Sequence, residues 1–342
     1  MSIRNTAAWF VVITLAILLL SVAQSILIPF VIALLIWFVI KKVRNLLDKI
    51  EFVQTRVPSW IKTIISSLAI FYFIFVVIQL LTVEIQGLTK SYPTYAANVE
   101  IIALKLNDLL QIDIREELIS GVNNFDFTIL LQSLFNSLSD TLSNMVMIIF
   151  YVTFMIVEEG LFLRKLKMMF GNQTKYDSAL TTIQKVDNSM SRYISLKSLV
   201  NLLSAGISFI ILSAVGVETP IFWAFLIFLF NFIPSVGPIM GTLFPTFFAL
   251  LQFGDFVPSL VIFFGVGTAV MLIGSLVEPK LMGNTLNISP LVAILALAIW
   301  GTLWGITGML LSVPITVAMI ILLSQFESTR PVAILLSEKG RV

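Results

Sequence analysis

Long apolar runs separated by short polar stretches dominate the chain. Eight such runs can be read along it, and they are Trp9–Leu20, Ile26–Ile40, Ile61–Leu81, Leu142–Val157, Leu199–Val217, Pro220–Phe253, Pro258–Val277 and Pro290–Leu323. About 20 apolar residues in a helix cross the hydrocarbon core of a bilayer, and several of these runs have that length. We therefore predict an all-α polytopic membrane protein with about eight hydrophobic segments.

Three of these regions are longer than one span and are interrupted. Trp9–Ile40 is broken around Pro29, Pro220–Phe253 around Asn231 to Pro238, and Pro290–Leu323 by several glycines and a proline. Because Pro and Gly disfavour a continuous helix, we interpret each region as a hairpin of two short helices, some of them re-entrant. The alternative is a long tilted helix that these residues only kink.

Composition supports a membrane protein and excludes several kinds of chemistry. The 342 residues are 58% hydrophobic and 12% charged, and they include no His and no Cys. Ser–His and Cys–His catalysis, disulfides and HExxH metal sites are therefore impossible. We expect no enzyme, no catalytic residue, no bound metal and no cofactor, with Na+ or H+ as a possible coupling ion. A formal net charge of +2 also gives no reason to expect a nucleic-acid partner.

The few charges are distributed unevenly. Lys and Arg gather in 41–62, in 158–198 and in the tail 324–342, whereas 83–141 has three basic residues and eight acids. Since cytoplasmic loops are enriched in Lys and Arg, the three basic segments and both termini are predicted to be cytoplasmic, and 83–141 is predicted to face outward. This arrangement requires the first interrupted region to cross the membrane and return.

The pattern divides the chain into five parts. They are membrane segments in 1–82 with the basic loop 41–62, the outward segment 83–141, a membrane helix with a basic loop in 142–198, a core at 199–323 with hairpins at 220–253 and 290–323, and the tail 324–342. The outward segment has amphipathic helical spacing. Its apolar stripes are expected to pack on each other or on a neighbouring subunit, which makes a homo-oligomer in the lipid bilayer our expectation; they are Val99, Ile102, Leu106, Leu109 and Leu110, then Ile129, Leu130, Leu134, Leu138 and Leu142.

The run Asn231–Gly241 contains the strongest local signal. Two prolines four residues apart remove two backbone donors, and a glycine between them opens backbone conformations closed to other residues. A break at membrane depth leaves polar backbone groups that protein, water or a ligand must satisfy. We therefore place candidate residues of a solute or ion path here, namely Asn231, Pro234, Ser235, Gly237, Pro238 and Gly241. A tightly packed hairpin tip with no transport role is the structural alternative.

A second group of candidates follows in the C-terminal third. Glu278 is the carboxylate most suited to an ion path, and its alternative role is an interfacial ion pair with Lys280. Neutral polar groups there can bind a hydroxylated solute or a cation, or can instead hydrogen-bond between helices. The full second group is Glu278, Pro279, Asn284, Gly301, Gly305, Thr307 and Pro314.

Four short runs of the sequence, which include most of these candidates, carry a resemblance to a known family. The runs Gly216–Pro220 and Asn231–Gly241, together with Glu278–Gly283 and Gly301–Pro314, resemble the signature of the autoinducer-2 exporter (AI-2E) family of bacterial membrane proteins. The match in order and spacing covers about 192–323. The resemblance implies a multi-pass protein of the bacterial cytoplasmic (inner) membrane that exports small solutes, some members being described as sodium–proton antiporters.

The predicted function is secondary export of a small solute, either an autoinducer-2-like signal or another small hydrophilic metabolite. A hairpin-bearing core would move against an oligomeric scaffold. The sequence has no phosphate loop of the GxxxxGK type, so an ion or solute gradient is the expected energy source. A sodium–proton antiporter and a non-transporting membrane scaffold protein remain the alternatives.

Overall fold

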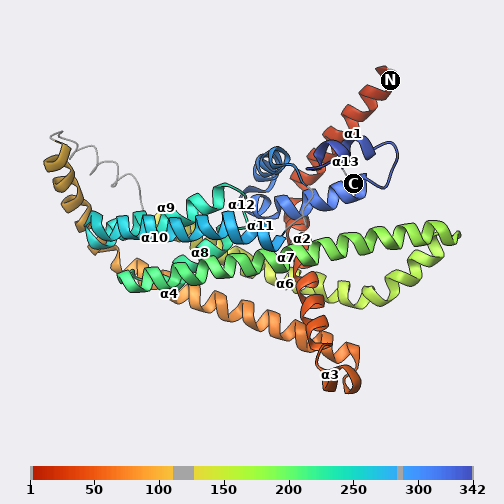
Figure 1. Cartoon of the computed structure of the whole chain (residues 1–342), viewed down its shortest axis with the longest axis horizontal. Coiled ribbons are helices and arrows are strands. Elements are labelled where there is room, and N and C mark those ends of the chain that lie inside the picture. Colours follow the sequence, from red (N-terminus) through yellow and green to blue (C-terminus); the bar gives the residue numbers. More distant parts are fainter. Residues whose placement is uncertain (1–2, 111–126, 283–287, 341–342) are drawn as a thin grey trace. The chain divides into compact units, whose positions relative to one another are not determined.

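The computed structural model describes residues 3–110, 127–282 and 288–340, and these residues are almost entirely helical (Figure 1). The helices are α1 (Ile3–Val22), α2 (Gln24–Leu47), α3 (Glu51–Arg56), α4 (Ser59–Leu110), α6 (Phe127–Met169), α7 (Gln173–Val215), α8 (Pro220–Phe230), α9 (Val236–Phe253), α10 (Phe256–Leu272), a π-helical turn η1 (Ile273–Val277), α11 (Glu278–Met282), α12 (Pro290–Leu323) and α13 (Arg330–Leu336). The part of the chain described contains no strand. The predicted all-α class is confirmed.

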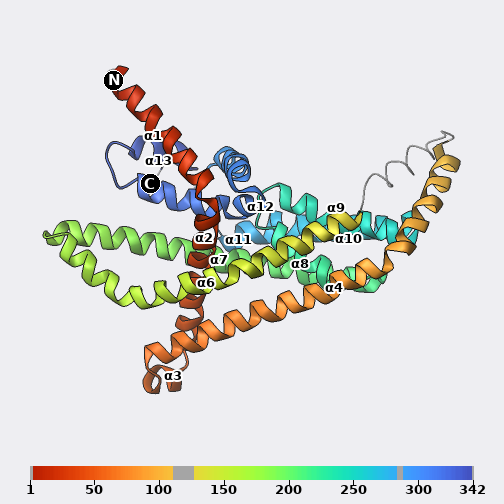
Figure 2. The same ribbon diagram turned by 180° about the vertical axis from the view of Figure 1, so that it is seen from behind.

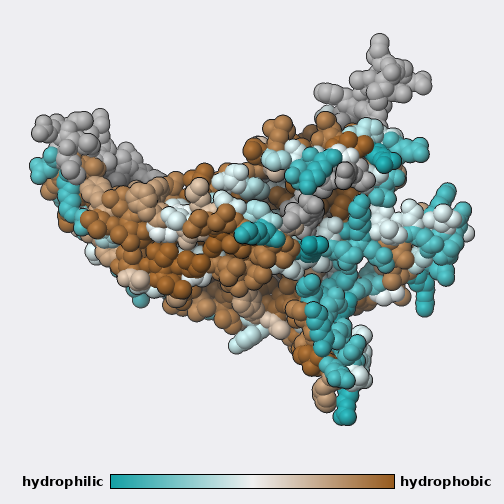
Figure 3. All heavy atoms as spheres, in the orientation of Figure 1, coloured by the Kyte–Doolittle hydropathy of each residue, from teal (hydrophilic) through white to brown (hydrophobic). Residues whose placement is uncertain are grey.

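Seven helices among the described residues are long and apolar enough to cross a membrane. Their large apolar side chains lie on the surface, as Tyr72, Phe73 and Met271 show with exposed fractions of 70%, 66% and 70%. Figure 3 shows this hydrophobic surface around α9 and α10. In water such a surface would drive aggregation, but it suits hydrocarbon, and the prediction of a polytopic membrane protein is confirmed.

The helices belong to two compact units. Unit 1 comprises Met1–Ser67, Ser143–Ser195 and Asn284–Val342, and unit 2 comprises Leu68–Leu142 and Leu196–Gly283. The long helices α4, α6 and α7 each contribute residues to both units. Each unit is therefore built from segments that are far apart in the sequence.

The expected hairpin in Trp9–Ile40 is wrong. Helix α1 ends at Val22 and α2 begins at Gln24, so only Ala23 separates them. The amide of Ala23 donates to Leu19 O at 2.9 Å, and the amide of Leu27 donates to Ala23 O at 2.9 Å. Helical hydrogen bonding thus passes through Ala23, and α1 runs on into α2 without reversal (Figure 2). Pro29 lies inside α2 and the helix continues through it, as membrane helices tolerate when neighbouring groups satisfy the freed carbonyl.

The predicted basic segments of unit 1 lie together. Lys41 Nζ is 2.8 Å from Asp187 Oδ2, and the Arg44 guanidinium bonds the Glu159 carboxylate at 2.8 Å. Thr182 Oγ1 donates to Gln325 Oε1 at 2.8 Å, which joins the tail to the same segment. These contacts fit the prediction that the three segments share one side of the membrane. However, 158–198 is not a loop, since α6 and α7 extend through it and leave only 170–172 between them.

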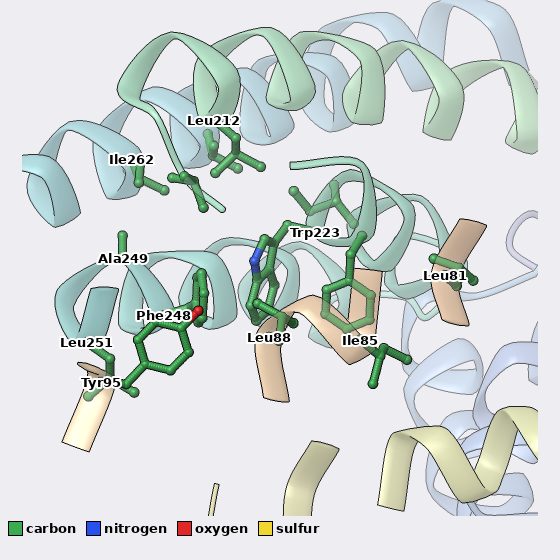
Figure 4. Packing of buried hydrophobic residues seen from close by; sticks show 14 of the residues in the cluster. Leu81, Ile85, Leu88, Tyr95, Leu212, Trp223, Phe248, Ala249, Leu251 and Ile262 are labelled. Atoms are coloured by element: carbon green, nitrogen blue, oxygen red, sulfur yellow. The ribbon is translucent and has the colours of Figure 1, made fainter. Parts of the chain in front are cut away.

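Unit 2 has a continuous apolar core. Leu81, Ile85 and Leu88 of α4 pack with side chains of α7 to α10, including Trp223 and Phe248 (Figure 4). Farther along α4 the predicted stripe residues Val99 and Ile102 join the same core, and Leu106 packs against it. The first half of the outward segment thus continues a membrane helix and packs within its own chain. The side chains of Leu109, Leu110 and the second predicted stripe lie outside the described residues.

Candidate functional site

The interrupted region Pro220–Phe253 folds as a helical hairpin within unit 2. Helices α8 and α9 pack against each other and are joined by residues 231–235. Pro234 O accepts from Val236 N–H at 2.6 Å, and Ser235 between them has φ 62° and ψ −45°. This is the geometry of a γ-turn, which is rare and strained for a residue with a side chain. The chain reverses where the two prolines predicted a break.

Glycines allow the two arms of this hairpin to meet. A Cβ at Gly237 would lie 1.8 Å from Phe230 O, and a Cβ at Gly241 would lie 3.5 Å from the Ile227 backbone. Gly237 therefore permits backbone contact that no other residue allows, whereas Gly241 contributes ordinary close packing. Pro238 lies in the first turn of α9, where a missing N–H costs little.

Two asparagines place polar atoms at the end of α8. Asn231 caps α8 and is 6% exposed, and its Oδ1 has no hydrogen-bond partner within the described part of the chain. Asn201 of α7 is 1% exposed and donates from Nδ2 to Phe228 O at 3.1 Å. Its Oδ1 is likewise without a partner among the residues described. Buried acceptors of this kind are uncommon and point to a water, ion or solute that completes them.

Glu278 forms an ion pair on the same face of α7. Its carboxylate lies 2.5 Å from Lys197 Nζ, and the two side chains are 26% and 10% exposed. The π-helical turn η1 ends at Val277, and the amide of the next residue, Glu278, donates to Ile273 O five residues back. Such turns shift the register of the residues that follow and occur often at functional sites. The partner of Glu278 is Lys197 and not the neighbouring Lys280, and Pro279 is exposed beside it.

The region Pro290–Leu323 is a second hairpin, in unit 1. Helical geometry in α12 is lost at Trp304 (φ −127°, ψ 16°) and Gly305 (φ 60°, ψ −143°). A Cβ at Gly308 would lie 1.9 Å from Trp300 O, eight residues earlier. In a straight helix these residues are about 12 Å apart, so the chain reverses between them. Figure 1 shows the two differently directed segments of α12.

The remaining candidates of this region surround the second break. A Cβ at Gly301 would lie 2.9 Å from Met309 Cε across the hairpin. Thr307 is half-buried two residues after the break, and Pro314 is buried in the second arm. Trp304 Nε1 donates to Leu20 O at 3.0 Å, which ties the break to α1.

The structure thus divides the predicted residues between the two units. Asn231, Pro234, Ser235, Gly237, Pro238, Gly241, Glu278 and Pro279 belong to unit 2, and Gly301, Gly305, Thr307 and Pro314 belong to unit 1. Asn284 lies outside the described residues.

Sequence reasoning missed the buried polar stripe of α7. It consists of Lys197, Asn201, Ser204 and Ser208, none more than 8% exposed. The spacing of three and four residues inside an apolar run was the available signal, because it places all four side chains on one helix face.

Comparison with known proteins places the chain among bacterial transport proteins. The family described as AI-2E family transporter matches residues 8–328. The chain is 28% identical over 323 residues to the AI-2 transport protein TqsA of Escherichia coli (strain K12), covering 93% of this chain and 91% of TqsA. It is 31% identical over 328 residues to a putative transport protein of Haemophilus influenzae, covering 93% and 92% of the two chains.

Proposed function

Because the chain belongs to the AI-2E family of membrane transporters, we propose that it exports a small hydrophilic solute by secondary transport. Autoinducer-2 is the first solute to test, since the relative TqsA is named as an AI-2 transport protein. Transport, rather than catalysis, is the activity of this family, and the protein is not an enzyme.

The buried break in the first hairpin carries the proposal. Asn231 lies buried where α8 ends, between Phe230 and Phe232 in the chain, with an acceptor that no described residue satisfies. An unsatisfied polar group in an apolar environment costs roughly 1–3 kcal/mol, and irregular backbone at membrane depth is tolerated where it lines a cavity. A solute path along the break accounts for both features.

The short length of α8 favours a re-entrant hairpin. Helix α8 has 11 residues and is therefore about 16 Å long, which is half the thickness of the hydrocarbon core. A segment of that length reaches the bilayer midplane and does not cross. The first hairpin is accordingly proposed to enter and leave from one side, with its turn at 231–235 near the midplane, as interrupted helices do in many secondary transporters.

Export is proposed to occur by movement of the hairpin-bearing helices against a scaffold formed by several copies of the chain in the bacterial cytoplasmic membrane. The sequence has no GxxxxGK phosphate loop, which favours an ion or solute gradient as the energy source.

The proposal is tested by efflux from proteoliposomes loaded with autoinducer-2 or with other small hydroxylated metabolites. We expect protein-dependent efflux, and we expect Asn231→Leu to reduce its rate at least tenfold. Thr153→Leu is the matched control, because it also replaces a polar side chain by leucine but at an exposed position of α6. No efflux of any solute by the wild-type protein would refute export. Normal efflux by Asn231→Leu would show that the turn at 231–235 does not line the solute path.

A further inference from the structure

The end of α2 in unit 1 has two charged faces of different character. Lys41, Arg44 and Asp48 follow one another at intervals of three and four residues, which places them on one helix face. All three form ion pairs within unit 1, at 2.8, 2.8 and 2.5 Å, and their partners are Asp187, Glu159 and Lys62. The charges of this first face are therefore neutralised inside the protein.

The second face of the same helix end is exposed. Lys42, Leu46 and Lys49 are four and three residues apart, so they too share a face. The amide of Lys49 donates to Leu46 O at 3.1 Å, which extends the helical turn past the last residue of α2. All three side chains are exposed, and neither lysine has an ion-pair partner among the described residues. The second face thus carries positive charge that the protein does not neutralise.

Helix α3 and the start of α4 add a third cation and aromatic surface. The guanidinium carbon of Arg56 lies 5.2 Å from the centre of the Phe52 ring, one turn earlier in α3. Phe52 is 64% exposed and Trp60 is 65% exposed. Figure 3 shows hydrophilic and hydrophobic residues side by side where Figure 1 places α3. We call this exposed surface the basic–apolar patch, and its members are Lys42, Leu46, Lys49, Phe52, Arg56 and Trp60.

The basic–apolar patch lies between two helices that suit a bilayer. Gln24–Leu47 before it and Ser59–Leu88 after it are both long and apolar enough to cross a membrane. The ion pair between Asp48 and Lys62 holds the adjoining ends of these helices together. Trp and Lys side chains at the ends of membrane helices lie at the level of the lipid headgroups, with their apolar parts toward the acyl chains. The patch is therefore positioned to meet headgroups.

Charge selects the kind of headgroup. Lys42, Lys49 and Arg56 lack a carboxylate partner among the residues described, and the exposed acid of this connection is Glu51, so positive charge exceeds negative. Cations beside exposed apolar side chains match a bilayer surface that contains anionic lipids. An acidic soluble protein would cover the cations but would give no reason for Phe52 and Trp60 to be exposed between two membrane helices. We propose that the basic–apolar patch binds the headgroups of anionic phospholipids in preference to zwitterionic ones.

The proposal can be tested with a single fluorophore, because the chain contains no cysteine. Asn45→Cys, at an exposed position beside Leu46, is labelled in the full-length protein and reconstituted in phosphatidylcholine vesicles. Spin-labelled phosphatidylglycerol or spin-labelled phosphatidylcholine is then added as quencher. We expect an apparent affinity at least threefold higher for phosphatidylglycerol, and we expect this ratio to fall as NaCl is raised. Equal quenching by the two lipids, or quenching by neither, would overturn the proposal.

Charge variants assign the preference to the basic–apolar patch. The triple variant Lys42→Gln, Lys49→Gln and Arg56→Gln is expected to lose the preference, so that the affinity ratio falls to about one. The matched control removes the same charge from exposed positions of α6 and α7, and it should keep the wild-type ratio; it combines Lys167→Gln, Lys175→Gln and Lys185→Gln. A wild-type ratio in the first variant would overturn the assignment.

Two further comparisons complete the test. The thermal unfolding midpoint in detergent shows whether the triple variant folds. If it does not fold, the three single variants are compared instead, each with a partly reduced ratio expected, and unchanged ratios in all three would overturn the assignment. The lipid preference does not rest on the proposed function. A preference without solute efflux would retain the patch and refute export, whereas efflux without a preference would do the reverse.

Discussion

Gly237 lies directly against the backbone of Phe230, so that a Cβ at this glycine would be 1.8 Å from the Phe230 carbonyl oxygen. The second hairpin has the same relationship, with 1.9 Å between a Cβ at Gly308 and Trp300 O. In both cases the glycine begins the second arm and the carbonyl belongs to the end of the first. In both hairpins, therefore, the two arms can approach each other because a glycine without a side chain lies at their first contact.

Gly237→Ala is predicted to destabilise the first hairpin by roughly 3 kcal/mol or more, because the new methyl group overlaps a backbone atom that cannot rotate away. The thermal unfolding midpoint in detergent measures this effect. Gly206→Ala is the control, since a Cβ at Gly206 meets nothing within 4 Å and α7 continues through this position. A Gly237→Ala protein as stable as Gly206→Ala would contradict the observed approach of the two arms.

The second hairpin allows a graded prediction. Gly308→Ala is expected to cost as much as Gly237→Ala, because it too meets a carbonyl. Gly301→Ala is expected to cost about 1 kcal/mol or less, since its nearest neighbour at 2.9 Å is the flexible end of Met309. Unfolding midpoints of the two variants should differ in this order. The reverse order would mean that α12 does not reverse at Gly305.

Ser235 stores backbone strain at the turn of the first hairpin, with φ 62° and ψ −45°. Ser235→Gly is predicted to stabilise the protein by about 1 kcal/mol, as relief of strain exceeds the added chain entropy. Ser235→Val should destabilise it by a similar amount, because a β-branched side chain tolerates positive φ poorly. The measurement is again the unfolding midpoint. Equal effects of Gly and Val would show that this turn is relaxed.

Tyr95 gives the protein a sensitivity to alkaline pH. Burial, and secondly the hydrogen bond that its hydroxyl donates to Glu218, raise the pKa of the Tyr95 phenol above its ordinary value of 10.0. A raised pKa means that the neutral phenol stabilises the fold fully below pH 10 and that this contribution is lost as the pH rises above that value. Tyr95→Phe should lower the midpoint at neutral pH and remove this part of the alkaline decline. An identical decline in both proteins would exclude Tyr95 as its source.

The orientation in the membrane can be mapped with single cysteines, because the chain contains none. A cysteine at Val257, which is 65% exposed just after the turn between α9 and α10, is predicted to react with an impermeant reagent only from outside the cell. A cysteine at the exposed Lys185 should react only from the cytoplasm. Labelling of Val257→Cys from the cytoplasm alone would invert the predicted orientation.

The hairpins at 220–253 and 290–323 were predictable from the sequence, whereas the hairpin expected in Trp9–Ile40 does not form. The first of these hairpins has three helix-breaking residues within five positions, namely Pro234, Gly237 and Pro238. The second has three glycines at helical spacing, namely Gly301, Gly305 and Gly308. The polar residues and Pro29 within Trp9–Ile40 also suggested a break, but this prediction was wrong. Helical hydrogen bonds through Ala23 carry α1 into α2, and α2 continues through Pro29, as membrane helices tolerate.

The sequence by itself determined the membrane environment, the helical class, the two breaks and the family, because apolar run length, Pro and Gly act locally. Only the tertiary structure showed that Glu278 pairs with Lys197, that Val99 and Ile102 pack into the core of unit 2, and that Asn201 bonds the end of α8. Lys197 and Glu278 are 81 residues apart in the chain, and Asn201 and Phe228 are 27 residues apart. Contacts over such separations are set by how helices pack, and local pattern does not encode which faces meet.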